Sequence, residues 1–403
     1  MAAVISAAFE LLMGPLAAGS PACDYAAVVS SYRCTPQNAR WRTSHMKLVT
    51  RSVMITVLLL GSCAIVWADD SPGLEKGEFD IGGYLQVKYE DHEDSRNPIV
   101  DEDGNLLKRN MNHIYIRRGR IKVEYQATEA SKFRIYFDGA KDKLSLLEAW
   151  IELKHEFGRV ETKLRVGQQN IPFGFENWYS SAKRDLPERS LAQNSLFAGE
   201  RERLVNLTVA PVQQLALNVA VLNGPGLKDS EFTYESPFED TKDVLARLRT
   251  EHELDGLTIS GGISGYLGKQ FDESDTVDFR TDKNRYGADA QVEFNVVRDL
   301  GRSAVRGEMM IAEEFGLRKI GYYLWLSQRL GRHFGAAARY DVFDRNARAE
   351  DGTRTDRVSL AGNYYYDAHV RFTLSYDIIK NEDVGEMTDV ADNVLTLMLQ
   401  YAI

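Results

Sequence analysis

The chain ends on the stretch DNVLTLMLQYAI (residues 392–403), and this stretch decides how the rest of it folds. From Leu395 to Ile403 every second residue is large and apolar, and the residues between them are Thr396, Met398, Gln400 and Ala402. Successive side chains of a strand point to opposite faces, so the pattern predicts a strand with one apolar face. Such a strand, with an aromatic residue third from the end, is typical of an outer-membrane β-barrel. There the last strand must pair with the first, because lipid offers no hydrogen-bond partner to an open sheet edge.

The same alternation recurs along most of the chain. Most of the alternating segments have about the 9–11 residues that a tilted strand needs to cross a bilayer. We count sixteen of them, near residues 79–90, 113–126, 132–138, 145–155, 159–168, 203–210, 215–222, 242–250, 257–267, 285–296, 303–313, 318–328, 333–343, 356–366, 368–379 and 392–403. An even number is usual in single-chain bacterial barrels. The predicted fold is therefore all-β, a 16-stranded antiparallel transmembrane β-barrel.

The lengths of the connections support this prediction. Every long connection follows an odd-numbered segment, and the connections after even-numbered segments are short. A barrel with both termini in the periplasm has short turns on that side and long loops outside. The longest connection, residues 169–202, is the third outer one and carries Pro172, Phe173, Phe175 and Trp178. Because large aromatic side chains favour packing over exposure to water, we expect this loop to fold inward and narrow the bore.

The N-terminal part has features of export. Residues 46–68 combine a basic start, an apolar run and a final Val66-Trp67-Ala68, which together predict a signal peptide cleaved before Asp69. We interpret residues 1–45 as an over-called N-terminal extension and residues 69–403 as the barrel. All three cysteines precede the predicted cleavage point. A disulfide framework or a thiol-ligated metal is therefore excluded from the barrel.

Charge and composition exclude further classes of function. Residues 1–68 hold five basic and two acidic residues, so the remainder has 44 basic and 57 acidic ones, a net charge of −13. An acidic balance argues against a nucleic-acid binder. The seven histidines are scattered singly, without metal-ligand spacing, and we expect neither a metal site nor another cofactor. An enzyme is not expected either, since no histidine accompanies the serines of the third outer loop.

Several runs carry a more specific resemblance. The run Leu164–Glu176 (LRVGQQNIPFGFE), followed by Ser180-Ser181, resembles the phosphate-selective porin O and P family, and so do Val221–Gly226, Arg306–Glu308 and Ala338–Asp344. The similarity extends over residues 78–403. By this resemblance the protein would be a bacterial outer-membrane porin, a homotrimer that passes small anions such as phosphate through an eyelet lined by the third loop. Its partners would be those anions, outer-membrane lipid and lipopolysaccharide.

The resemblance also implies an anion-binding constriction. In the family, Lys and Ser side chains bind the anion, and arginines guide it toward that site. Ser180 and Ser181 match the family's paired loop serines, and Lys183 and Arg184 are basic and close by, although the family usually places its lysine elsewhere. Strand alternation turns further basic residues toward the lumen, namely Arg120, Lys122, Arg134, Lys163, Arg165, Arg247 and Arg249. The same faces carry Glu124, Asp138, Glu148, Glu152 and Glu161, which could simply pair with them across the sheet.

Two alternatives to an anion channel stay open. If the lumen acids neutralise the basic residues, the protein is a general, weakly selective diffusion porin. If loops fill the bore, it is a non-conducting adhesin or structural barrel. At the end of the chain, Ile403 replaces the terminal Phe or Trp that barrel-insertion machinery generally prefers, and we expect that machinery to recognise Tyr401 together with Ile403.

Overall fold

The computed structural model describes residues 74–93, 99–100, 106–107, 112–140, 143–224, 242–271, 280–295, 301–349, 353–382 and 392–403. The predicted N-terminal extension (1–45) and signal peptide (46–68) lie outside the described residues.

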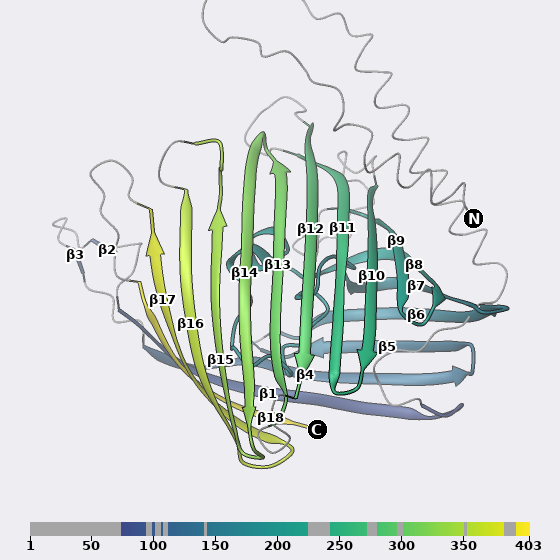
Figure 1. Ribbon diagram of the computed structural model, residues 1–403, viewed down its shortest axis with the longest axis horizontal. Coiled ribbons are helices and arrows are strands. Elements are labelled where there is room, and N and C mark those ends of the chain that lie inside the picture. Colours follow the sequence, from purple (N-terminus) through teal and green to yellow (C-terminus); the bar gives the residue numbers. More distant parts are fainter. Residues whose placement is uncertain are drawn as a thin grey trace, which may run out of the picture. The chain divides into compact units, whose positions relative to one another are not determined.

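Sixteen strands form one closed antiparallel barrel. In chain order they are β1 (Phe79–His92), β4 (His113–Thr128), β5 (Ser131–Asp138), β6 (Ser145–Phe157), β7 (Val160–Asn170), β8 (Arg201–Val212), β9 (Leu215–Leu222), β10 (Asp243–Leu254), β11 (Leu257–Phe271), β12 (Arg280–Phe294), β13 (Ser303–Glu314), β14 (Leu317–Leu330), β15 (Phe334–Asp344), β16 (Arg354–Tyr365), β17 (Val370–Asn381) and β18 (Val394–Ala402). In Figure 1, β10–β14 run steeply while β1, β5 and β6 run close to horizontal, as strands of opposite walls of a tilted barrel do.

Two small elements lie between the barrel strands. Strands β2 (Ile99–Val100) and β3 (Leu106–Leu107) pair with each other between β1 and β4. The helix α3 (Leu191–Leu196) lies between β7 and β8. No helix of the described residues is long and apolar enough to cross a membrane.

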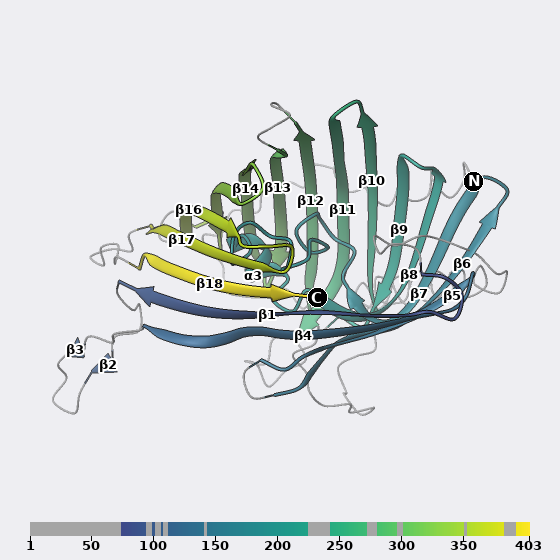
Figure 2. The same ribbon diagram turned by 90° about the horizontal axis from the view of Figure 1, so that it is seen from below.

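The last strand closes the barrel against the first. Strand β18 pairs with β1 from Tyr84 opposite Ala402 to His92 opposite Val394, and the two run side by side in Figure 2. This confirms the prediction made from the C-terminal stretch. Since every barrel strand has a neighbour on each side, the sheet has no unpaired edge to expose to lipid.

The two faces of the wall differ as a membrane barrel requires. On β18, Leu397, Leu399 and Tyr401 are 41–50% exposed, whereas the alternating Thr396 and Gln400 are at most 5% exposed. Other strands repeat the pattern, with Leu, Ile and Phe outward and charged or amide side chains inward. An apolar outer face and a polar inner face match a wall between lipid and water.

Several strands are longer than the alternation predicts. Strand β10 continues to Leu254 and β11 begins at Leu257, so only Asp255 and Gly256 remain between them. The backbone ladder needs no apolar side chain, so it continues through the polar residues Glu251 to Glu253, where the alternation is lost. Gly256 has a φ of 73°, in the left-handed region that glycine adopts without steric cost.

Candidate functional site

The third outer loop, residues 171–200, lies against the inner face of the wall. Gln86 of β1 and Gln400 of β18 donate hydrogen bonds to the carbonyl oxygens of Ser181 and Ala182, at 3.2 and 3.1 Å. Other inward-facing side chains of β11, β13, β15 and β16 also bond the loop. The loop is therefore attached to strands that are far apart in sequence.

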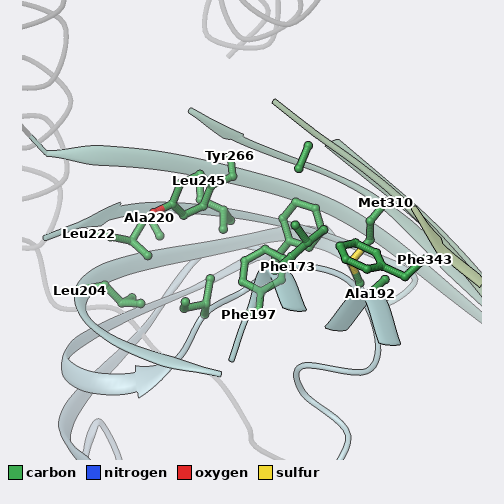
Figure 3. Close-up of a cluster of buried hydrophobic side chains, with 13 residues drawn as sticks. Phe173, Ala192, Phe197, Leu204, Ala220, Leu222, Leu245, Tyr266, Met310 and Phe343 are labelled. Atoms are coloured by element: carbon green, nitrogen blue, oxygen red, sulfur yellow. The ribbon is translucent and has the colours of Figure 1, made fainter. Parts of the chain in front are cut away.

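An apolar cluster holds one side of the loop (Figure 3). Phe173 is fully buried, and its ring centroid lies 4.7 Å from that of Phe197, near the other end of the loop. Both pack with inward-facing residues of β8–β11, β13 and β15, namely Leu204, Ala220, Leu222, Leu245, Tyr266, Met310, Ala312 and Phe343. A Cβ on Gly287 of β12 would lie 2.7 Å from the Phe173 ring, so the wall needs glycine there to admit the aromatic side chain.

A carboxylate of the loop forms the second anchor. Glu188 accepts hydrogen bonds from Arg117 Nε and Nη2 at 2.7 and 2.9 Å, and it also contacts Lys88 and Arg118. The ladder between β1 and β4 shifts register between Gln86 and Val87, which leaves Arg117 as an extra residue on β4. This β-bulge lets two consecutive arginines reach the same carboxylate. Burial alone would raise the pKa of Glu188, but the three cations hold it well below its usual range.

A third anchor connects the loop to β15 and β16. Glu176 accepts bonds from the backbone nitrogen and the hydroxyl of Ser190, the N-cap of α3. Asp341 accepts a bond from the nitrogen of Leu191 at 2.8 Å, and Arg357 donates to the oxygen of Arg189 at 2.7 Å. Carboxylates at the free nitrogens of the first helical turn fix where α3 begins.

The predicted constriction residues have unequal surroundings. Ser181 is buried, and its hydroxyl bonds Tyr84 of β1 and accepts from Arg120 Nη1 at 3.1 Å. Ser180 and Lys183 are exposed. Arg184 is buried, with 1% of its surface exposed. The structure thus brings Ser181 together with Arg120, which was predicted separately as a lumen residue.

Most of the predicted lumen arginines and lysines have carboxylate partners. Arg120 bonds Asp138 at 2.7 Å, and Arg165 bonds Glu152 at 2.6 Å. Further ion pairs are Lys122 with Asp80 and Glu124, Arg134 with Glu124 and Glu148, and Arg247 with Asp289. Lys163 is half-buried on β7 and faces Lys154 across the ladder. Arg249 is exposed near the end of β10, on the inward-facing side of the alternation.

Sequence reasoning missed several inward cations. Lys88, Arg118, Arg201, Arg339 and Arg357 are all at most 8% exposed and all take part in ion pairs. One signal was available for Arg118. Two consecutive arginines in a strand cannot alternate without placing one in lipid, so the pair Arg117-Arg118 indicates a bulge.

The sequence matches one known protein family. Residues 94–241 and 327–403, together more than half of the chain, match the family described as phosphate-selective porin O and P. No curated protein matches the chain in sequence.

Solved structures of similar fold include an outer membrane protein, an outer membrane channel and a porin. The in-vitro folded trimer form of OmpT from Vibrio cholerae is 13% identical with a TM-score of 0.55, covering 82% of this chain and 100% of that one. The outer membrane channel DcaP of Acinetobacter baumannii is 11% identical with a TM-score of 0.58, covering 84% and 100%. An anion-selective porin from Comamonas acidovorans is 11% identical with a TM-score of 0.58, covering 81% and 100%. At these identities the likeness concerns the fold alone.

Proposed function

Because the chain belongs to the phosphate-selective porin O and P family of outer-membrane channel proteins, we propose that it passes small anions, phosphate among them, by passive diffusion. The water-filled path would run between the third outer loop and the inner faces of β5–β7. Among the described residues, the loop forms hydrogen bonds or apolar contacts with β1, β4, β8–β16 and β18, and these strands hold it in place.

The observation that carries this proposal is that carboxylates of the inner wall are shared among cations. Glu124 contacts Lys122, Lys132 and Arg134, all within 3.3 Å. Glu148 forms ion pairs with both Arg134 and Arg201, and Glu188 of the loop forms ion pairs with three cations. Some of these cations have a second carboxylate, because Lys122 also contacts Asp80 and Arg134 is shared by Glu124 and Glu148. Around Glu188, three cations face only two carboxylates, Glu188 and Glu90, so the net local charge there is positive. Such a lining attracts anions and lowers the cost of removing their water.

A weakly selective diffusion porin is the second candidate, and one observation favours it. Arg120, Arg165 and Arg247 each contact a carboxylate at 2.6–3.0 Å, and an ion paired in this way attracts a passing anion less than a free one. The two candidate functions differ in how strongly the basic residues of the inner wall still attract a permeating anion when they are paired with carboxylates.

The remaining parts of the proposal concern assembly. We propose a homotrimer in the outer membrane, surrounded by lipid and lipopolysaccharide and exported by the signal peptide at 46–68. Tyr401 and Ile403 are 50% and 64% exposed, so the barrel-insertion machinery would find both side chains accessible.

Single-channel recording tests the proposed selectivity. The purified protein is placed in a planar bilayer under a KCl gradient, and the reversal potential is measured with and without added phosphate. Anion preference predicts a reversal toward the chloride potential and a phosphate-dependent block. Lys183→Gln removes an exposed loop cation and should shift the reversal toward potassium, whereas Lys76→Gln, outside the strands, should not. A reversal near zero without block supports the weakly selective porin, and absence of conductance supports an adhesin.

A further inference from the structure

A buried carboxyl group of the wall lies directly against the third outer loop. Glu308 of β13 is 4% exposed, and its Oε2 accepts hydrogen bonds from the backbone nitrogen of Glu176 at 3.2 Å and from the Tyr323 hydroxyl at 3.1 Å. Gly174 of the loop packs against the other oxygen, since a Cβ on this residue would overlap Oε1. The loop backbone therefore docks on the carboxyl group itself, and glycine leaves the room for that contact.

Glu308 has no cation to neutralise it. Within the part of the chain that the structure describes, it forms no ion pair, and its Oε1 has no hydrogen-bond partner. Asp289 of β12 stands directly opposite it across the ladder. Like charges directly opposite each other in a sheet are destabilising, and a buried charge without a partner is costly. An ionised Glu308 would thus carry both costs.

The charged groups packed around Glu308 balance without it. These ion pairs are Asp289 with Arg247 of β10 (3.0 Å), Glu176 of the loop with Arg339 of β15 (3.4 Å), and Asp341 of β15 with both Arg339 and Arg357 of β16 (3.0 and 3.1 Å). They contain three carboxylates and three guanidinium groups, so their charges cancel. Arg249, the next inward-facing cation of β10, is exposed to water, which screens its charge. Arg306, two residues before Glu308 on β13, pairs with Glu293 and Asp185.

We propose that Glu308 binds a proton and that this proton latches the third outer loop to β13. A proton needs no cavity, and the neutral acid puts no excess charge beneath Gly174. Its O–H group can donate to the Asp289 carboxylate opposite. When the pH rises, the proton leaves to water, the new carboxylate is repelled by Asp289 and Glu176, and the loop is released. The inference goes beyond the proposed anion selectivity, because it concerns docking of the loop and not the ion that passes.

Infrared spectroscopy of the folded protein in detergent detects this proton. A protonated carboxyl group has a carbonyl stretching band that a carboxylate lacks. Spectra are recorded upward from about pH 6, where ordinary carboxyl groups are charged. We expect a band that disappears as the pH rises in the wild-type protein and that is missing from Glu308→Gln at every pH. Glu313→Gln makes the same change at an exposed position of the same strand and should keep the band.

Hydrogen exchange of the loop backbone measures the latch. At each pH, exchange of the amides of Gly174 to Glu176 is compared between the wild-type protein and Glu308→Gln, so that the effect of pH on the exchange chemistry cancels. The uncharged glutamine should keep the loop docked. The ratio of the two rates should rise by up to about tenfold per pH unit and level off once the infrared band has disappeared, because one proton links the docked and released states.

Two results would overturn the proposal. One is the same carbonyl spectrum for wild type and Glu308→Gln at about pH 6, which would mean that Glu308 is charged under the docked loop. The other is loss of the band with no change in the exchange ratio, which would mean that the proton does not hold the loop. If Glu308→Gln does not fold, Tyr323→Phe decides. It removes a donor to the carboxylate, so the band should persist to higher pH, whereas an unchanged titration would assign the band to another acid. A reversal potential near zero would refute the anion selectivity and leave these measurements unaffected.

Discussion

Replacing Phe173 by alanine should release the third outer loop while the barrel stays folded. The side chain is fully buried between the Phe197 ring and Gly287 of β12. Removing a buried Phe side chain costs about 3–5 kcal/mol. That cost falls on docking of the loop, because the closed ladder of sixteen strands does not include residues 171–200. At about 1.4 kcal/mol per tenfold change, the ratio of docked to undocked loop should fall roughly 10²- to 10⁴-fold.

Single-channel recordings measure this change directly. Wild-type channels should show one steady level, and Phe173→Ala channels should flicker to a larger conductance as the loop leaves the bore. Trp178→Ala is the matched control, since this aromatic residue of the same loop is 36% exposed and should leave the recordings unchanged. Circular dichroism should show little change in the barrel's unfolding midpoint. If Phe173→Ala channels keep the wild-type conductance and noise, the apolar cluster does not hold the loop.

Three further predictions concern the loop anchor and the lipid face. Glu188→Gln leaves three cations without their carboxylate and should cost about 3–5 kcal/mol, detectable as faster proteolysis of the loop. Glu313→Gln breaks an exposed pair and should cost under about 1 kcal/mol. Because the folded protein lowers the pKa of Glu188, this anchor is complete above about pH 4.3, the pKa of a glutamate in the unfolded chain. The anchor is lost only as the pH falls through the lower pKa of Glu188 in the folded protein. Flicker of the channel that begins near pH 6 would contradict this. Leu397→Lys places a charge on the outward face and should cost about 2–4 kcal/mol near the bilayer midplane, lowering the folded band on a gel of unheated samples, whereas Thr396→Ser should not.

The alternation of apolar and polar residues in the sequence was sufficient to predict the wall of the barrel. The outward leucines of β18 and the closing pair of β1 and β18 follow from the C-terminal stretch, because lipid permits only one orientation of an alternating strand. Strand ends were harder to place. Residues 251–253 of β10 are polar and still pair with β11 along the backbone ladder, so no apolar pattern marks them as part of the strand.

The candidate site was predictable only in part. Strand facing identified Arg120, and resemblance identified Ser181, but their contact at 3.1 Å depends on where the loop crosses the bore. The bulge on β4 changes the facing of Arg117 and Arg118, so a rule of strict alternation assigns one of them to lipid. The interior of the loop has no periodic pattern, so nothing in the sequence distinguishes buried Arg184 from exposed Lys183.

The acidic balance of the chain is a poor guide to what its bore attracts. The whole sequence carries a net charge of −10. Salt screens exposed charges beyond about 8–10 Å, so a permeating ion responds mainly to the side chains that line its path. On the inner wall, Glu124 contacts three cations and Glu148 contacts two, and Lys122 and Arg134 each contact a second carboxylate as well. The sign of the field in the bore therefore depends on this local pairing and not on the net charge of the chain.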